Sequence, residues 1–195
     1  AIWHFAHICS GAVIGQNCTL GQNVMVADNA SLGNNVKVQN NVAIYGGVTI
    51  EDDVFLGPSC VLTNVTNPRS QVSRKSLYEK TLIKRGSTIG ANATIVCDIT
   101  LGRYCFVGAG SVVTKDIPDY GLVLGNPGKL SGYMSRHGHK LKFDESGRAT
   151  CPESKFVYEK VDQQVSCLDL NEDDPLPTEL SVGSKTYDSL KNRCP

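Results

Sequence analysis

An aliphatic residue recurs at every sixth position over most of this chain. The series is interrupted once, between Leu62 and Ile83. Its members are Ile2, Ile8, Ile14, Leu20, Val26, Leu32, Val38, Ile44, Ile50, Leu56, Leu62, Ile83, Ile89, Ile95, Leu101, Val107 and Val113. A helix repeats near 3.6 residues and an ordinary strand alternates with period two, so a period of six fits neither. A hexapeptide period is instead typical of a β-helix.

The positions between the aliphatic residues support this interpretation. A small or β-branched residue usually follows four positions later, as at Val24 and Val36, and Gly is frequent directly after the aliphatic residue, as at Gly15 and Gly21. Gly and Asn tolerate the left-handed backbone angles that tight corners need. Each six-residue repeat, or rung, therefore predicts one short strand and one corner. Three rungs make a triangular coil of 18 residues, and residues 1–125 are predicted to form an all-β solenoid, a parallel β-helix.

The interruption predicts an inserted loop. Leu62 and Ile83 lie 21 positions apart, which is 15 more than one rung. Residues 63–82, with the sequence TNVTNPRSQVSRKSLYEKTL, are thus expected to leave the solenoid and return in register. A long insertion in a regular solenoid is usually functional, although a tolerated surface loop is the alternative.

The repeat fades after Val113, and two further segments follow. Residues 126–142 are predicted to form a turn and a short basic helix that covers the open end of the solenoid. Residues 143–195 are acidic and polar, and a small hairpin near 149–170 followed by a loose tail is expected there.

Charge, hydropathy and cysteine positions indicate the kind of environment in which the protein is expected to work. The formal net charge is zero, so no overall attraction to nucleic acid or membranes is expected, and no apolar run approaches the length of a membrane span. Three of the eight cysteines, Cys18, Cys60 and Cys105, fall at interior positions of the repeat, where Cys acts as a small hydrophobic residue. Free thiols in a cytoplasmic protein are therefore predicted.

Several runs of this sequence resemble a known family. They are IWHFAHI (2–8), VKVQNNVAIYGGVTIEDDVFLGPSCVLTNVTNPRS (36–70), RKSLY (74–78), KRGSTIGANATIVC (84–97) and GNPGKLSGYMSRHG (125–138). Together they resemble the hexapeptide-repeat acyltransferases, and most closely the bacterial enzymes that acetylate the 3-amino group of UDP-2-acetamido-3-amino-2,3-dideoxyglucuronate for surface polysaccharide (O-antigen) synthesis. The resemblance implies a left-handed β-helix, acetyl-CoA as co-substrate, no metal, and a homotrimer with sites between subunits.

Asn64 is the candidate catalytic residue. It lies at the corner where the loop departs, and its side-chain oxygen can accept a hydrogen bond from a sugar amine and orient the lone pair. An amide is not a strong base, so the departing thiolate is expected to take the proton, directly or through water. A corner Asn that only stabilises its turn is the alternative.

The remaining candidates are assigned to the two substrates. Arg69, Arg74 and Lys75 suit a uronate carboxylate or a pyrophosphate, since Arg recognises such groups bidentately. The candidates for contacts with uracil, ribose or sugar hydroxyls are Gln39, Asn40, Asn41 and Tyr45, of which Asn40 and Asn41 are equally suited to corners. CoA is expected along the C-terminal coils, with small residues for pantetheine and cations for phosphates: Ala91, Ala109, Lys115 and Lys129.

The sequence also allows other catalytic residues and other functions for the same fold. His4 or His7 in the HFAH run is the alternative general base, although packing at a corner is favoured for both. A zinc carbonic anhydrase of the same fold needs three His from neighbouring coils, and the chain has none between His7 and His137. An acyltransferase for another nucleotide sugar, such as a dTDP-amino-hexose, and a non-catalytic scaffold stay open as alternatives.

Overall fold

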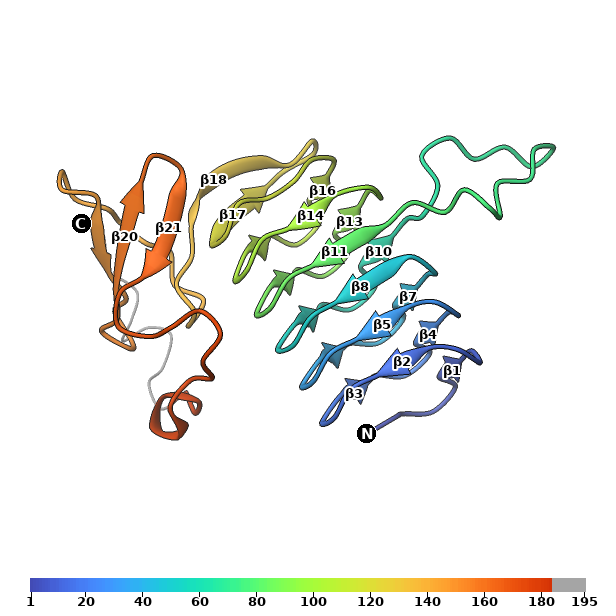
Figure 1. The fold of residues 1–195 in the computed structure, drawn as a ribbon, viewed down its shortest axis with the longest axis horizontal. Helices are drawn as coiled ribbons and strands as arrows, with labels where there is room; N and C mark the ends of the chain where they lie inside the picture. Colours follow the sequence, from blue (N-terminus) through green and yellow to red (C-terminus); the bar gives the residue numbers. More distant parts are fainter. Residues whose placement is uncertain (184–195) are drawn as a thin grey trace.

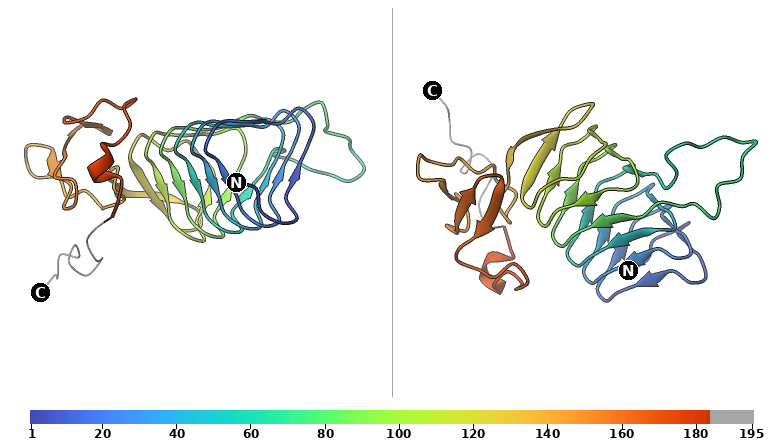
Figure 2. Two further views of the ribbon diagram at one scale, coloured as in Figure 1. Left: turned by 90° about the horizontal axis from the view of Figure 1, so that it is seen from below. Right: turned by 45° about the horizontal axis from the view of Figure 1, so that its top comes forward.

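The computed structural model describes residues 1–183. Short strands wind into a parallel β-helix with three faces, followed by a small antiparallel sheet at the C-terminal side (Figure 1). The coils lie one after another in a regular stack (Figure 2). With three sheets as its faces, the solenoid agrees with the predicted left-handed hexapeptide-repeat β-helix.

Each face of the solenoid is one sheet. The first face contains β1 (His7–Ile8), β4 (Met25–Val26), β7 (Ala43–Ile44), β10 (Val61–Leu62), β13 (Thr94–Ile95) and β16 (Val112–Val113). The second contains β2 (Val13–Ile14), β5 (Ser31–Leu32), β8 (Val48–Ile50), β11 (Thr81–Ile83) and β14 (Thr100–Leu101). The third contains β3 (Thr19–Leu20), β6 (Lys37–Val38), β9 (Phe55–Leu56), β12 (Thr88–Ile89), β15 (Phe106–Val107), β17 (Gly121–Leu124) and β18 (Lys129–Tyr133). All these strands are parallel except β18, which pairs antiparallel with β17.

The aliphatic residues of the period stack inside the coils. Leu20, Ile44, Leu62 and Ile95 are fully or almost fully buried, and the whole series from Leu20 to Val113 belongs to one core cluster. Burying a side chain of this size contributes roughly 1.5–3 kcal/mol. The core predicted from the period is therefore confirmed from Leu20 to Val113, and it holds the three faces together. At the start of the series the prediction fails for Ile2, which is 62% exposed because no preceding coil covers it, and Ile8 and Ile14 are partly buried.

Cysteines fill part of the same core. Cys18, Cys60 and Cys105 are buried at the predicted interior positions, and the seven cysteines of the described chain are free thiols. Burial raises the pKa of Cys60 and of Cys105 to about 12, so both thiols stay protonated near neutral pH.

The corners depend on left-handed backbone angles at a fixed position of each rung. Asn17, Asn23, Asn29, Asn35 and Asn41 all have φ between 53° and 61°. Asn is among the few residues with a side chain that adopt this conformation readily. The frequent Asn of the sequence thus has a direct structural cause, and the chain turns at the same place in every coil.

The predicted helix after residue 126 is wrong. Residues 129–133 form β18, which pairs antiparallel with β17 and ends the third face. Gly132 has a φ of 141°, which is incompatible with a helix, and the unpaired edge of β17 offers backbone hydrogen bonds to the returning segment. A strand therefore closes this edge of the solenoid.

A three-stranded antiparallel sheet follows the solenoid. It is formed by β19 (Arg148–Thr150), β20 (Val157–Val161) and β21 (Gln164–Cys167), with a short 3-10 helix, η1 (Thr178–Leu180), after it. The hairpin predicted near 149–170 corresponds to β20 and β21, and β19 adds a third strand. The part of the predicted tail after residue 183 lies outside the described residues. Within residues 1–183, no helix combines the length and the hydrophobicity that crossing a bilayer would require.

Aromatic rings attach this sheet to the last corners of the solenoid. Tyr104 and Tyr120 stack with ring centroids 5.2 Å apart, Tyr158 of β20 meets Tyr120 edge-on at 5.5 Å, and the Arg136 guanidinium lies 4.4 Å from the Tyr104 ring centroid. A Cβ on Gly86 would come within 2.3 Å of the Tyr104 ring, so Gly is required there. The sheet is thus packed against the solenoid through its own aromatic cluster.

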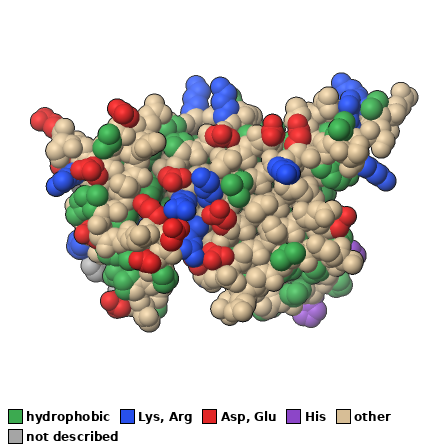
Figure 3. All heavy atoms as spheres, in the orientation of Figure 1, with side chains coloured by type: hydrophobic (Ala, Val, Ile, Leu, Met, Phe, Trp, Pro, Cys, Tyr) green, Lys and Arg blue, Asp and Glu red, His purple; other side chains and the backbone are tan. Residues whose placement is uncertain are grey.

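An acidic segment covers a group of arginines at the same junction, where basic and acidic side chains gather on the surface (Figure 3). Arg103 pairs with Asp173 at 3.1 Å, and Arg136 donates to the carbonyl oxygen of Asn171 at 3.1 Å. The Glu172 carboxylate accepts hydrogen bonds from the Tyr120 hydroxyl and from the backbone N–H of Cys167. The predicted polar segment is therefore partly ordered through charge pairing.

Candidate functional site

The inserted loop is the largest departure from the regular coils. It leaves after β10 at Leu62 and returns at Thr81 in β11, and it projects away from the solenoid body (Figure 1). Its returning limb lies close to two glycines of the preceding coil. A Cβ on Gly47 would lie 2.8 Å from the carbonyl oxygen of Glu79, and one on Gly46 would lie 3.8 Å from the Tyr78 ring. The small Gly46–Gly47 corner thus makes room for the base of the loop.

The loop lines an open hollow of about 680 Å³. Its lining residues are Asn64, Val65, Pro68, Arg69, Ser70, Gln71, Val72, Ser73, Arg74, Lys75 and Tyr78. Four predicted site residues, Asn64, Arg69, Arg74 and Lys75, therefore lie around one space. Three of them, Arg69, Arg74 and Lys75, are cations, so the lining residues carry positive charge.

Two side chains of the hollow have unused hydrogen-bonding capacity. Asn64 is partly buried, and its carbonyl oxygen accepts the backbone N–H of Glu79 at 2.9 Å, whereas its side-chain amide makes no hydrogen bond within residues 1–183. The Nε of Arg74 is buried without a partner in the same part of the chain. A buried donor without a partner is costly, so a bound acceptor would be favoured at this position. Arg69 is exposed and donates to the Pro68 carbonyl oxygen at 3.2 Å.

The other predicted sugar-binding residues fall in two groups. Tyr45 is exposed and lies one coil before Thr63, because β7 and β10 pair in register. Asn40 and Asn41 belong to a different corner of the triangle, between the third and first faces. The Asn40 amide oxygen accepts the Gln22 backbone N–H at 2.8 Å, and that of Asn41 accepts the Asn23 side chain at 3.1 Å.

Through these bonds Asn40 and Asn41 stabilise their corner, and their predicted contacts with the substrate stay a prediction. Gln39 lies at the same corner. Within one chain, this group is not brought to the loop hollow.

The residues predicted for CoA lie on the last coils. Ala91 and Ala109 stack on the same corner in adjacent coils, where the carbonyl oxygen of Ala91 accepts the Gly110 backbone N–H at 2.9 Å. Lys129 begins β18 after the turn that packs on Val112, and Lys115 lies exposed at the next corner. Ala91, Ala109 and Lys129 thus surround one corner, and Lys115 is apart from them.

The four histidines lie away from Asn64 in the chain. His4 and His7 are exposed on the first coil, and β1 and β10 are separated by β4 and β7 in the first face. At about 4.8 Å per strand, this is roughly 14 Å. His137 and His139 are both partly buried. His139 lies 2.7 Å from Glu153, and His137 lies 2.9 Å from the carbonyl oxygen of Leu180.

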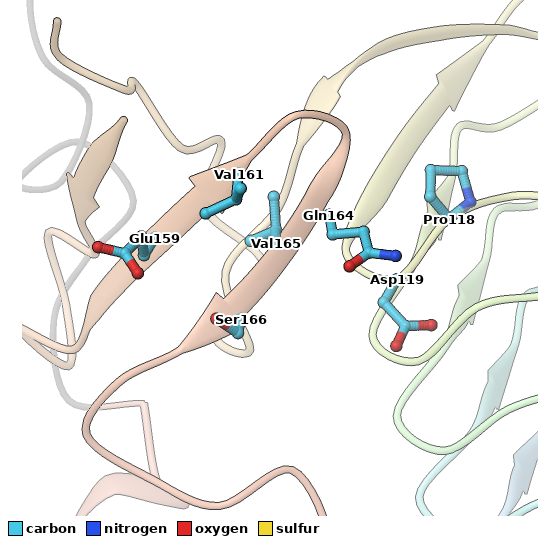
Figure 4. Close-up of a pocket in the computed structure, with 7 residues that line it drawn as sticks. All are labelled: Pro118, Asp119, Glu159, Val161, Gln164, Val165 and Ser166. Carbon is cyan, nitrogen blue, oxygen red and sulfur yellow. The ribbon is translucent and has the colours of Figure 1, made fainter. Parts of the chain in front are cut away.

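A second hollow, of about 510 Å³, lies between the last solenoid corner and the C-terminal sheet (Figure 4). Asp119 comes from the solenoid side, whereas Glu159, Val161 and Gln164 come from β20 and β21. The Asp119 carboxylate accepts the backbone N–H of Arg103 at 2.8 Å. This acidic hollow contains none of the predicted site residues. The candidate functional site is therefore the loop hollow.

Sequence reasoning missed part of the loop site. Tyr78, Gln71 and Ser73 line the hollow, and Glu79 and Cys97 join its base. A usable signal existed for the last pair, because Glu79 and Cys97 are 18 positions apart, which is one coil. Counting back one coil from Cys97 would have placed Glu79 beside it.

Comparison with known families supports the repeat. The bacterial transferase hexapeptide family matches residues 29–64 and 80–115, and the hexapeptide repeat of succinyl-transferase matches residues 11–45. The first match ends at Asn64 and resumes at Lys80, so the interruption between them corresponds to the loop. These matches and the fold support the class of hexapeptide-repeat acyltransferases.

Individual relatives are nucleotide-sugar and related acetyltransferases. A segment of 74 residues is 49% identical to the dTDP-3-amino-3,6-dideoxy-alpha-D-galactopyranose 3-N-acetyltransferase of Aneurinibacillus thermoaerophilus, and it covers 38% of this chain and 38% of that protein. The galactoside O-acetyltransferase of Lactococcus lactis is 29% identical over 49% of this chain and 51% of its own length. The matched segments thus span about half or less of these relatives.

Solved structures share the architecture. The acetyltransferase domain of PglB from Neisseria gonorrhoeae, solved in complex with acetyl coenzyme A, has 26% identity and a TM-score of 0.57 over 66% of this chain and 56% of that chain. A GDP-perosamine N-acetyltransferase from Caulobacter crescentus has 20% identity and a TM-score of 0.56 over 65% of this chain and 53% of its own. The latter likeness concerns the fold alone.

Proposed function

We propose that this protein transfers the acetyl group of acetyl-CoA to an amino group of a nucleotide-linked sugar. The observation that carries the proposal is the loop hollow, in which Asn64 and three cations surround one space beside a hexapeptide-repeat solenoid. Acetyl-CoA is the expected donor because the PglB domain, with 26% identity, binds it. An amino sugar is the expected acceptor because the dTDP-sugar relative is a 3-N-acetyltransferase.

Acetyl transfer to an amine requires the protein mainly to position the two substrates and to supply hydrogen bonds. The neutral amine attacks the thioester carbonyl carbon, a C–N bond forms, and negative charge develops on the carbonyl oxygen. The C–S bond then breaks, and the amide and the CoA thiol are the products once the amine proton has reached the thiolate. In this scheme the Asn64 side chain accepts a hydrogen bond from the amine and orients its lone pair. Backbone N–H groups at the corners supply donors for the oxyanion.

We infer a UDP-linked 3-amino uronate as the acceptor, specifically the 3-amino group of UDP-2-acetamido-3-amino-2,3-dideoxyglucuronate. Arg69, Arg74 and Lys75 in the hollow supply more positive charge than an uncharged sugar ring would need. A uronate carboxylate is a natural partner for the unpartnered Nε of Arg74. A dTDP-linked 3-amino sugar is the second candidate, because the 49% identical segment comes from an enzyme for such a substrate.

The solenoid is expected to work as a homotrimer with sites between subunits. Lys37 is the only Lys, Arg, Asp or Glu among the outward side chains of strands β1–β16, so the three faces can approach other chains without burying many charges. The predicted sugar-binding residues lie at two corners, Gln39, Asn40 and Asn41 at one and Tyr45 at the other. They would contact one substrate only if a groove between two chains joined these corners. The CoA site assigned to Ala91, Ala109, Lys115 and Lys129 would lie along the same groove.

A thiol-release assay tests the proposal. Acetyl-CoA is supplied with UDP-2-acetamido-3-amino-2,3-dideoxyglucuronate, with the corresponding uncharged UDP-glucose derivative, and with a dTDP-3-amino-3,6-dideoxyhexose. Turnover of the first at a higher kcat/KM than the second supports the uronate. Preference for the dTDP sugar supports the second candidate. Release of no thiol with any amino sugar would overturn the proposed function.

A further inference from the structure

One carboxylate ties together the two ends of the loop and the neighbouring coil. Oε2 of Glu79 accepts a hydrogen bond from the Thr66 backbone N–H at 2.8 Å and one from the Thr66 hydroxyl at 2.6 Å. The same oxygen accepts a hydrogen bond from the Cys97 thiol at 2.9 Å. Thr66 belongs to the departing limb, Glu79 to the returning limb, and Cys97 to the next coil. We call this group of three residues the loop clasp.

The loop clasp brackets Asn64 on both sides. The Thr63 hydroxyl accepts the Cys97 backbone N–H at 2.9 Å, which anchors the residue before Asn64. The carbonyl oxygen of Asn64 itself accepts the Glu79 backbone N–H at 2.9 Å. The backbone around Asn64 is therefore held at Thr63 and at Asn64 itself, whereas the Asn64 side chain lines the hollow and takes no part in the clasp.

The solenoid does not need these bonds for its own packing. Leu62, Ile83 and Ile95 are almost completely buried in the core, and β11 pairs with β8 through three consecutive residues. The loop itself has few such contacts, since residues 66–73 are exposed. The carboxylate is thus the main polar connection between the loop limbs and the coil.

The charge of Glu79 strengthens the connection. Its hydrogen bonds with Cys97 and then with Thr66 hold the pKa of the carboxyl below its ordinary value of 4.5. The group is therefore ionised near neutral pH, and hydrogen bonds to an ionised acceptor are stronger than those between neutral groups. The Cys97 thiol is buried, so it acts as a donor shielded from solvent.

We propose that Glu79 is a positioning residue, which holds Asn64 and the cationic loop over the solenoid by joining Thr66 to Cys97. This inference rests on the proposed function for its effect on turnover. Glu79 does not contact the substrate. It acts through the backbone of Asn64 and through the shape of the hollow, so its loss affects the amino sugar and leaves acetyl-CoA binding largely unchanged.

Two matched pairs of variants test the clasp. Glu79→Ala removes the acceptor, and Glu79→Gln keeps one oxygen without the charge. Cys97→Ala removes the donor, and Cys97→Ser keeps it. We expect kcat/KM for the amino sugar to fall at least about tenfold in Glu79→Ala, equivalent to about 1.4 kcal/mol. The Gln variant should recover part of this loss, and Cys97→Ser should be closer to wild type than Cys97→Ala.

Trypsin supplies a readout that needs no substrate. The loop contains Arg69, Arg74 and Lys75, of which Arg69 and Lys75 are already exposed. Release of its base should therefore act by letting the loop backbone adopt the extended conformation that the protease cleaves. Glu79→Ala is expected to be cleaved within the loop several-fold faster than the wild-type protein, with Glu79→Gln between them. The KM for acetyl-CoA and the midpoint of thermal unfolding should remain close to wild type in all four variants.

The outcomes separate the clasp from the proposed reaction. Unchanged cleavage of Glu79→Ala would overturn the clasp, even in a protein that acetylates amino sugars. Faster cleavage with unchanged turnover would overturn the positioning role. A parallel loss of turnover and melting temperature, without rescue by Glu79→Gln, would show a merely structural residue. Absence of thiol release by the wild-type protein would instead overturn the proposed function, whatever trypsin reveals.

Discussion

Asn64 is suited to acetyl transfer because it can orient an amine without titrating. Its amide oxygen is an acceptor at every accessible pH, and its side chain is free of internal hydrogen bonds in the described chain. Whatever pH dependence turnover shows would then come from the substrate amine. This distinguishes the proposed scheme from one with a His base.

Substitution of Asn64 by Ala should slow turnover without abolishing it. Loss of one orienting hydrogen bond is expected to cost on the order of 2–4 kcal/mol in transition-state stabilisation. The KM for acetyl-CoA should change little, because the contact is with the sugar. Steady-state kinetics over a range of pH should retain the acidic limb of the wild-type profile.

Three controls accompany this measurement. Asn67→Ala changes an exposed loop Asn that does not line the hollow, and it should behave like the wild-type protein. His4→Asn and His7→Asn should also remain active. The proposed scheme would be wrong if Asn64→Ala had the wild-type rate and either His variant lost the acidic limb of the pH profile. A mechanism with a histidine as general base would then explain the data.

Asp52 should make folding stability depend on pH at the acidic end. Its carboxylate accepts the Asn34 backbone N–H at 2.7 Å and pairs with Arg85 at 3.0 Å. The backbone hydrogen bond from Asn34 is the main cause that lowers the pKa from 3.8. Since the folded pKa is the lower one, the stabilisation is present above about pH 4 and is lost as the pH falls through the folded value.

Asp52→Asn should therefore flatten the acidic part of the stability curve. Urea unfolding between pH 2.5 and 6 (roughly spanning the ordinary carboxyl range) measures the free energy of unfolding of both proteins. The difference between them should be largest near pH 6 and shrink toward pH 2.5. Asp28→Asn, at an exposed corner position, is the matched control. A constant difference across this range would contradict the role assigned to the Asp52 charge.

At the scale of elements, the loop and the solenoid are separable in their packing. The core cluster contains residues from before and after the loop, and no residue between 63 and 80 belongs to it. The inserted segment should therefore decide what binds, whereas the coils should decide whether the chain folds.

Deletion of residues 66–80 with a short bridging turn should leave a folded solenoid that no longer acetylates the sugar. The core side chains on both flanks are retained, but Arg69, Arg74, Lys75 and the clasp are removed. Circular dichroism and thermal unfolding report the fold, and thiol release reports turnover. Binding of CoA, measured by calorimetry, is the internal control and should persist. Turnover with a normal KM for the sugar would show that the loop has no role in the site.

For the whole molecule, association should complete the site. Gln39 and Asn64 lie at different corners of the triangle, so one chain cannot bring them to one ligand. Sedimentation equilibrium at micromolar concentration should give three times the chain mass of 21.0 kDa. The measurement is repeated without substrates as a control, because the faces should associate on their own. A stable monomer would contradict a site shared between chains.

The regular part of the molecule was predictable because its period fixes the direction of each side chain. Every sixth residue must point inward for the coil to close, so the positions of Leu20, Ile44 and Leu101 in the core followed from counting. The inward cysteines followed for the same reason. No comparable rule governs the loop, whose shape depends on contacts between residues that are not periodic.

The segment after residue 126 shows the limit of this reasoning. Its basic residues suggested a helix, but the free edge of β17 selected a strand, since backbone pairing with a neighbour outweighs local preference. Gly132 was the available signal against a helix. The aromatic cluster of Tyr104, Tyr120 and Tyr158 joins residues from distant parts of the chain. Their spacing in the sequence does not predict that these rings are in contact.

The closure of each coil after 18 residues limits how the length of this solenoid can change. Strand partners such as Thr19 and Lys37, or Thr88 and Phe106, are 18 positions apart. Gain or loss of one complete coil returns all later side chains to the same face and only slides Asn64 along the axis. Gain or loss of a single rung instead rotates everything after it by a third of a turn, which carries the loop to another edge of the prism. Whole coils and corner insertions are thus the two changes of length that keep the loop on the same edge of the solenoid.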